Sequence, residues 1–160
     1  MSLATQVLEI CMKHNFMLAT AESCTGGMII AALTDIAGSS AVVDRGFVTY
    51  SNDAKSQMLG VDPQIITQYG AVSQEVAHAM ADGALQNSRA HIALSVTGVA
   101  GPGASEAKPE GMVWFGLAMK NRETRTQLHQ FGPLGRSEVR RMAVKSALEM
   151  ALEAVSTYKP

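Results

Sequence analysis

The sequence has few of the features that mark secreted, metal-binding or membrane-spanning proteins. Only two cysteines occur in 160 residues, Cys11 and Cys24, and they form no CxxC pair. A disulfide framework is therefore not expected, and a reducing cytoplasm is the simplest location. The four histidines are scattered without ligand-like spacing, so no metal site is expected. No apolar run approaches the ~18 residues of a membrane span, and the N-terminus lacks the basic segment of a signal peptide.

An excess of one charge sign is also missing. Thirteen Lys and Arg residues face fourteen Asp and Glu residues, for a formal net charge of -1. Such a chain has no general attraction for nucleic acids or anionic lipid, so neither a nucleic-acid nor a membrane partner is expected. Aromatic residues make up 5% of a chain that is 47% hydrophobic, which predicts a mainly aliphatic core. This composition permits a homo-oligomer interface without locating one.

Hydrophobic periodicity predicts helices and strands that alternate along one domain, residues 1–160. Helices are predicted over 3–14, 26–38, 51–60, 62–70, 74–88 and 137–158. Strands are predicted over 16–20, 41–50, 91–98, 112–120 and 124–131. Helix caps are expected at Ser23 or Thr25, Ser51 or Asn52, Asp62, Ser73 and Ser137. This order predicts a three-layer α/β/α sandwich with a mixed, mostly parallel sheet and at least one antiparallel strand.

Three loops rich in small or polar residues each follow a predicted strand: "AESCTGG" (21–27), "TYSNDAK" (49–55) and "SVTGVAGPG" (95–103). Because open α/β sheets bind ligands beyond the carboxyl ends of their strands, we expect these loops to line one pocket. The first loop leads into a helix through Gly26 and Gly27, a design whose backbone N–H groups suit an anion or an oxyanion. The alternative is a tightly entered, capped helix.

The first two loops contain candidate catalytic groups. Ser23 needs a base that takes its proton, and no histidine lies in these loops. Lys55 can serve if burial depresses its pKa, with Tyr50 relaying the proton or positioning the lysine. Cys24 is the rival nucleophile, but it lacks a histidine partner and is more typical of a small buried hydrophobe. Taken singly, Lys55 also fits a solvated surface lysine, and Tyr50 a packed residue at a strand end.

The other candidate ligand contacts lie in the first loop, the third loop and the "GRSEVRR" segment. Thr25 is interpreted as a helix cap or a ligand contact. In the third loop, Thr97 and the neighbouring amides face the predicted pocket, although its glycines also suit an ordinary turn. Arg136 and Arg140 begin the last helix and suit phosphate or carboxylate recognition. Arg140 and Arg141 fit equally well on the solvated face of that helix.

Five segments, "TAESCTGG", "RGFVTYSNDAKSQMLGV", "GAVSQEVAHAMADGAL", "SVTGVAGPG" and "KPEGMVWFGLA", together resemble the C-terminal domain of the competence/damage-inducible CinA family. The similarity extends from about residue 5 to residue 155 in the same order. It implies an α/β/α sandwich with a mixed five-stranded sheet. It also implies hydrolysis of the carboxamide of nicotinamide mononucleotide to nicotinate mononucleotide and ammonia, in pyridine-nucleotide recycling. No metal or organic cofactor is implied.

Transferred by motif, the family's catalytic serine falls on Ser23, its tyrosine on Tyr50 and its lysine on Lys55. The implied contacts around the substrate are Thr97 and the loop glycines Gly26, Gly27, Gly98 and Gly101. In the resulting hypothesis, neutral Lys55, assisted by Tyr50, deprotonates Ser23, and backbone N–H groups around Thr25–Gly27 bind the oxyanion. The sequence is equally compatible with Tyr50 as the base and Lys55 as its assistant. Backbone amides, with Arg136 or Arg140, bind the phosphate.

Two segments depart from the family pattern. The glycine-rich loop is "GPGASEAKPEG", with Glu110 where a small apolar residue is common, and "LGR" (134–136) replaces the frequent "GDR". Both lie in expected nucleotide-contact loops. They leave open a non-catalytic nucleotide-binding module, or an amidase acting on another substrate.

Overall fold

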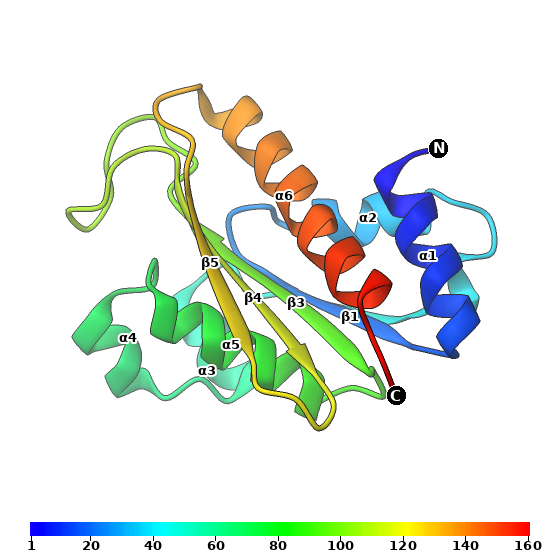
Figure 1. The fold of residues 1–160 in the computed structure, drawn as a ribbon. Coiled ribbons are helices and arrows are strands. Elements are labelled where there is room, and N and C mark those ends of the chain that lie inside the picture. The colour runs from blue at the N-terminus through cyan, green and yellow to red at the C-terminus, as the bar shows by residue number, and fades with distance from the viewer.

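The computed structural model describes all 160 residues, Met1–Pro160, and contains five strands in one sheet (Figure 1). The strands are β1 (Leu18–Glu22), β2 (Val43–Val48), β3 (Ile92–Gly98), β4 (Met112–Met119) and β5 (Arg125–Gln130). The helices are α1 (Leu3–His14), α2 (Met28–Thr34), α3 (Asn52–Leu59), α4 (Pro63–Tyr69), α5 (Gln74–Gln86) and α6 (Arg136–Ser156), with a short 3₁₀ turn, η1 (Ser39–Ala41). None of the helices is both long and apolar enough to cross a lipid bilayer.

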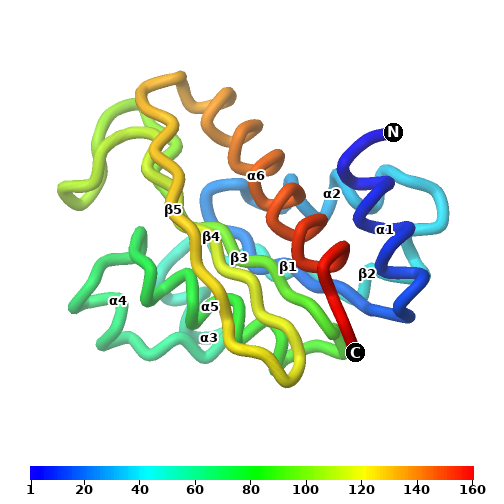
Figure 2. The backbone as a smooth tube through the Cα atoms, in the orientation of Figure 1, coloured from blue at the N-terminus to red at the C-terminus, as the bar shows by residue number.

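The sheet has the strand order β2-β1-β3-β4-β5. Strand β1 pairs in parallel with both β2 and β3, whereas β4 is antiparallel to its two neighbours, β3 and β5. Four strands therefore run in one direction. Helices α1, α2 and α6 cover one face, and α3, α4 and α5 cover the other (Figures 1 and 2). The predicted three-layer sandwich with a mixed, mostly parallel sheet is confirmed.

Two apolar clusters fill the space on either side of the sheet. The larger contains 25 buried residues and joins the sheet to α1, α2 and α6, while the smaller contains 10 and lies beneath α3, α4 and α5. The interior strand β1 is buried over its whole length. A strand covered on both faces needs no polar alternation, which is why its sequence reads as a short run of small and apolar residues.

The sequence located every α-helix and strand but missed η1 and misplaced several boundaries. The first strand runs from Leu18 to Glu22 rather than over 16–20, and α2 spans Met28–Thr34 rather than 26–38. The caps predicted at Ser51, Asp62 and Ser73 are confirmed, since each side chain accepts a hydrogen bond from the first turn of its helix. The caps predicted for the second and the last helices are wrong. Gly27 and Gly135 precede those helices, and neither offers a side chain.

Candidate active site

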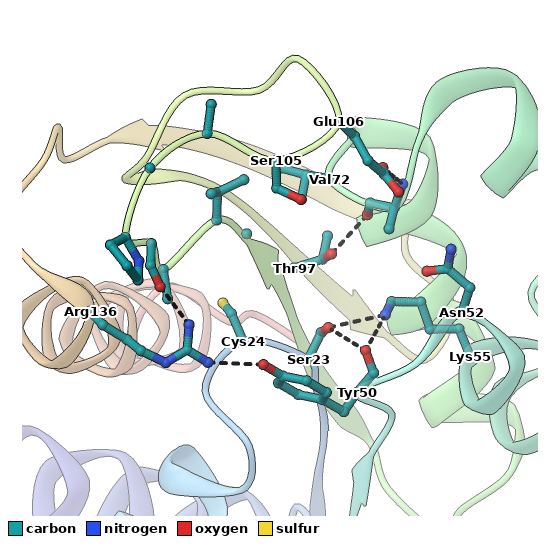
Figure 3. Close-up of a pocket in the computed structure, with 18 residues that line it drawn as sticks. Ser23, Cys24, Tyr50, Asn52, Lys55, Val72, Thr97, Ser105, Glu106 and Arg136 are labelled. Atoms are coloured by element: carbon teal, nitrogen blue, oxygen red, sulfur yellow. Dashed lines mark hydrogen bonds between the residues drawn. The ribbon is translucent and has the colours of Figure 1, made fainter.

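A cavity of about 450 Å³ opens where the loops after β1, β2 and β3 meet (Figure 3). Its lining includes Ser23, Tyr50, Lys55, Thr97 and Arg136. The volume lies in the range usual for small-molecule sites. The three loops converge because the strands before them are parallel neighbours, so their carboxyl ends share one edge of the sheet.

Ser23 and Lys55 form the central pair of this cavity. Lys55 lies on α3, whose N-cap Ser51 accepts a hydrogen bond from the Ala54 N–H at 3.1 Å. The side chain enters the protein, so that Lys55 is only 1% exposed and its Nζ lies 3.0 Å from Ser23 Oγ (Figure 3). Ser23, at the end of β1, is 8% exposed. The pair therefore lies at the cavity floor, largely removed from bulk water.

The surroundings of Lys55 suit the neutral amine. Its Nζ donates to the backbone carbonyls of Thr49 at 3.1 Å and Tyr50 at 3.3 Å. As an ammonium, Nζ also donates to Ser23 Oγ. In the neutral amine the two carbonyls satisfy both N–H groups, and the lone pair is left for the proton of the Ser23 hydroxyl. No carboxylate pairs with this lysine. Burial lowers the pKa of Lys55, because a charged ammonium loses hydration there.

Cys24 lies beside Ser23 but in a different environment. Its side chain is 5% exposed, and burial raises the pKa of its thiol to about 12. At neutral pH this cysteine is a thiol rather than a thiolate, and only the thiolate is a strong nucleophile. The geometry thus favours Ser23 over Cys24 as the group that Lys55 activates.

Tyr50 contributes to the site at two separate points. Its backbone carbonyl accepts from Lys55, whereas its side chain is 61% exposed and turns toward α6. There its hydroxyl accepts a hydrogen bond from Arg136 Nη2 at 2.9 Å (Figure 3). The Arg136 Nη1 donates to the Gly101 carbonyl at 2.6 Å. No hydrogen bond joins the Tyr50 hydroxyl to Ser23 or Lys55, so a proton-relay role for Tyr50 stays a prediction.

Glu22 is a fully buried carboxylate next to Ser23 that the sequence reasoning missed. One oxygen accepts from the Thr25 hydroxyl at 2.7 Å and the Ile29 N–H at 2.8 Å. The other accepts from the Thr20 hydroxyl at 3.2 Å and the Ile30 N–H at 3.0 Å. Glu22 thus satisfies the N-terminal donors of α2 and replaces the predicted hydroxyl cap. An acidic residue in an otherwise apolar buried strand was the sequence signal.

The predicted substrate contacts divide into two groups. Those that line the cavity are Thr97, Gly98, Gly101 and Arg136, and those that do not are Thr25, Gly26, Gly27 and Arg140. Arg140 instead donates to the carbonyls of Cys24 at 3.0 Å and Thr25 at 3.4 Å, which ties the loop after β1 to α6. Lining residues that the sequence analysis did not propose as ligand contacts include Asn52, Val72, Ser105 and Glu106.

The backbone amides of the first loop are only partly free. The Gly26 N–H donates to the Ser23 carbonyl at 3.1 Å, and the Met28 N–H donates to the Thr25 carbonyl at 3.0 Å. The N–H groups of Cys24, Thr25 and Gly27 donate to no other residue, but of these three residues only Cys24 lines the cavity. The Cys24 N–H is therefore the loop amide that a ligand in the cavity can reach. No group of three or more His, Cys, Asp or Glu side chains is placed to hold a metal ion.

Comparison with known proteins identifies the relatives of this chain. Residues 1–155 match the model of the CinA C-terminal domain. The chain is 49% identical over 150 residues to the nicotinamide-nucleotide amidohydrolase PncC of Escherichia coli K12, covering 93% of this chain and 90% of that protein. It is 54% identical over 133 residues to the PncC of Enterobacter agglomerans, covering 82% and 80%.

Solved structures agree with these sequence matches. The competence/damage-inducible protein CihA of Agrobacterium tumefaciens superposes with a TM-score of 0.92 at 50% identity, covering 97% of this chain and 94% of that one. A CinA superfamily protein of Klebsiella pneumoniae superposes with a TM-score of 0.93 at 34% identity, covering 98% and 97%. This chain therefore belongs to the CinA C-terminal domain family.

Proposed function

We propose that this protein is a nicotinamide-nucleotide amidase with Ser23 as nucleophile and Lys55 as base. It hydrolyses the carboxamide of nicotinamide mononucleotide to nicotinate mononucleotide and ammonia, a step of pyridine-nucleotide recycling. Two relatives that match most of this chain are named nicotinamide-nucleotide amidohydrolases, which supports the choice of substrate.

One observation carries the proposal: a buried lysine whose Nζ lies 3.0 Å from the oxygen of a buried serine. A serine hydroxyl is a weak nucleophile unless a neighbouring base accepts its proton. Lys55 can accept it because burial lowers the pKa of its amine, and no carboxylate forms an ion pair with it. Ser–Lys pairs of this kind are a known variant of the serine triad.

The first half of the reaction forms an ester. The lone pair of Lys55 accepts the hydroxyl proton, and Ser23 Oγ attacks the carbon of the substrate carboxamide. The oxyanion of the tetrahedral intermediate accepts a hydrogen bond from the free Cys24 N–H, the loop amide that borders the cavity. Lys55 then returns its proton to the leaving nitrogen, the C–N bond breaks, and ammonia departs.

The second half uses water as the nucleophile. Lys55, neutral again, takes a proton from a water that enters the place of the ammonia. The resulting hydroxide attacks the acyl carbon, and the ester bond to Ser23 Oγ breaks. Lys55 gives its proton to that oxygen, which restores the serine and releases nicotinate mononucleotide.

Arg136 provides the positive charge for the phosphate of the substrate. Its guanidinium lines the cavity and is bonded to a carbonyl and a phenol oxygen, with no carboxylate to neutralise it. A phosphate can therefore form charge-assisted hydrogen bonds with the Arg136 guanidinium. Arg140 is occupied by the nucleophile loop and acts as a support for that loop.

The proposal is tested by incubating the purified protein with nicotinamide mononucleotide and measuring ammonia. We expect turnover by the wild type and a fall in kcat of about 10⁴-fold or more in Ser23→Ala, because a nucleophile has no substitute. Cys24→Ala is the matched control, and it should retain activity within about threefold, since removing a buried thiol costs only about 1 kcal/mol of stability. An inactive Cys24→Ala beside an active Ser23→Ala would reverse the assignment.

The same experiment separates the amidase from a nucleotide-binding module. Binding of nicotinamide mononucleotide without ammonia release would exclude the amidase and support the module. Absence of both binding and turnover would point to another carboxamide substrate, which a panel of small amides would identify.

A further inference from the structure

Glu110 joins two segments that border the cavity but are far apart in sequence. Its Oε1 accepts a hydrogen bond from the Gly103 N–H at 2.7 Å, in the loop between β3 and β4. Its Oε2 accepts from the Gly135 N–H at 3.2 Å, at the start of α6. Both carboxylate oxygens are thus used on backbone donors, and hydrogen bonds to an ionised acceptor are stronger than neutral ones.

The side chain lies behind the cavity wall rather than within it. Glu110 is half-buried and does not line the cavity, whereas Gly101 and Gly103 do. It packs directly on Gly101: a Cβ there would lie 2.5 Å from the Glu110 carboxyl carbon. Gly101 also has a φ of +91°. Both the lack of space and the backbone conformation therefore exclude a side chain at this position. Glu110 therefore supports the loop from outside and does not occupy the ligand space.

Arg136 lies between the two segments that Glu110 connects. It follows Gly135 directly, and its Nη1 donates to the Gly101 carbonyl at 2.6 Å. Glu110, Gly135, Arg136 and Gly101 thus form a closed ring of contacts, of which Arg136 and Gly101 line the cavity. We infer that Glu110 is a positioning residue that sets the Arg136 guanidinium and the glycine loop for the phosphate of the substrate.

This inference rests on the proposed amidase function and extends it. A guanidinium that is already fixed loses less conformational freedom when it binds, so pre-organisation appears mainly as tighter substrate binding. The Glu110 carboxylate is also placed at the N-terminal end of the 21-residue helix α6, where the helix dipole favours a negative charge. Removing it should loosen the phosphate end of the site and leave the Ser23–Lys55 pair intact.

The kinetic test compares Glu110→Ala and Glu110→Gln with the wild type. We expect the KM for nicotinamide mononucleotide to rise about tenfold in Glu110→Ala, with kcat changed less than about threefold. Glu110→Gln should fall between the two, because a carboxamide keeps one acceptor oxygen and turns an NH₂ toward the other donor. The control is Glu123→Gln, an exposed carboxylate without a hydrogen bond, which should not alter KM.

A second measurement separates positioning from loss of fold. The rate at which a small fluorophosphonate modifies Ser23 should be the same in Glu110→Ala and wild type, because this probe lacks the nucleotide. In an Arg136→Ala background, Glu110→Ala should add less than about a twofold change in KM. The effects of the two substitutions should not add, because Glu110 acts through Arg136. An unchanged or lowered KM in Glu110→Ala, slower Ser23 modification, or full additivity with Arg136→Ala would each overturn the inference.

A third readout does not depend on turnover. In ¹H–¹⁵N spectra, the Gly103 and Gly135 amides and the Arg136 side-chain N–H groups should be protected from exchange in the wild type and lose protection in Glu110→Ala. If the wild type releases no ammonia from nicotinamide mononucleotide, the proposed function fails, while these spectra still decide whether Glu110 positions Arg136. Unaltered protection of Arg136 in Glu110→Ala would refute the positioning role.

Discussion

Lys55 is the residue on which the proposed chemistry depends. Lysine is rarely buried without a carboxylate partner, because a charged ammonium is costly to remove from water. Here the amine is enclosed and bonded to two backbone carbonyls and Ser23 Oγ. The folded protein therefore binds the proton of the Lys55 ammonium less tightly than the unfolded chain does. We expect both the activity and the stability of the protein to depend on pH for this reason.

Replacing Lys55 by methionine should separate these two effects. Activity should fall about 10²–10⁴-fold, the usual contribution of a general base. The free energy of unfolding at pH 7 should rise, because the folded state no longer has to release or bury a charge. Kinetics with nicotinamide mononucleotide and urea denaturation measure the two quantities, and Lys13→Met, which changes an exposed lysine of α1, is the control.

The pH dependence of kcat/KM and of the free energy of unfolding of the wild type gives the sign of the Lys55 pKa shift. The proposed mechanism requires the neutral amine, so kcat/KM should rise with pH through the lowered pKa of Lys55. The free energy of unfolding should also rise between that pKa and the ordinary lysine value of about 10.4, because the unfolded chain binds the extra proton there. In Lys55→Met this slope should disappear. A wild-type stability that falls across the same window would contradict a lowered pKa.

At the scale of the elements, α2 begins in an unusual way. Gly27 precedes it with a φ of 102° and offers no cap, and the carboxylate of Glu22 in β1 accepts from the N–H groups of Ile29 and Ile30 instead. The same carboxylate binds the Thr25 hydroxyl, so the helix start and the nucleophile loop share one support. Strand, loop and helix are thus fixed relative to one another by a single side chain.

Glu22→Gln should lower the free energy of unfolding by about 3 kcal/mol, because a carboxamide has one acceptor oxygen and presents an NH₂ to groups that are donors. Urea denaturation measures this change. Glu9→Gln is the control, since this exposed carboxylate of α1 has no hydrogen bond and should change stability by less than about 0.5 kcal/mol. Equal stability of the two variants would mean that Glu22 does not support α2.

At the scale of the whole molecule, the position of Lys55 depends on how closely α3 approaches α5. Gly83 on α5 permits this approach, because a Cβ at Gly83 would lie 2.1 Å from the Leu59 carbonyl oxygen at the end of α3. Leu59 and the neighbouring Val61 belong to the smaller apolar cluster, which anchors α3 on the sheet. The layer that covers one face of the sheet therefore sets the distance between Lys55 and Ser23.

Gly83→Ala should test this packing. In an exposed helix the substitution would stabilise the protein by about 0.5–1 kcal/mol. Here we expect a loss of about 1–3 kcal/mol from overpacking, together with slower modification of Ser23 by a fluorophosphonate as α3 moves outward. Thermal unfolding and labelling rates measure both. A gain in stability with unchanged labelling would show that α3 does not depend on the close approach.

Local rules predicted most of the fold. Ser51, Asp62 and Ser73 cap the helices they precede, and Gly60 ends α3, because these effects involve residues only a few positions apart. The alternation of strands and helices likewise fixed the layered class and the edge of the sheet where the ligand loops meet. The sequence also grouped Ser23 with Lys55, since each lies after one of two strands that are parallel in the sheet.

Long-range contacts decided the rest. The first N–H groups of α2 donate to the Glu22 carboxylate in β1. The Gly135 N–H at the start of α6 donates to Glu110, 25 residues away. Neither helix therefore needs a capping side chain directly before it. Side-chain direction decided that Arg136 enters the cavity while Arg140 supports the nucleophile loop. By itself the sequence determined the elements, their layers and the candidate nucleophile and base, because periodicity and capping act over a few residues. Only the tertiary structure decided which polar side chains face the ligand and which hold the walls, because that depends on partners that packing brings together.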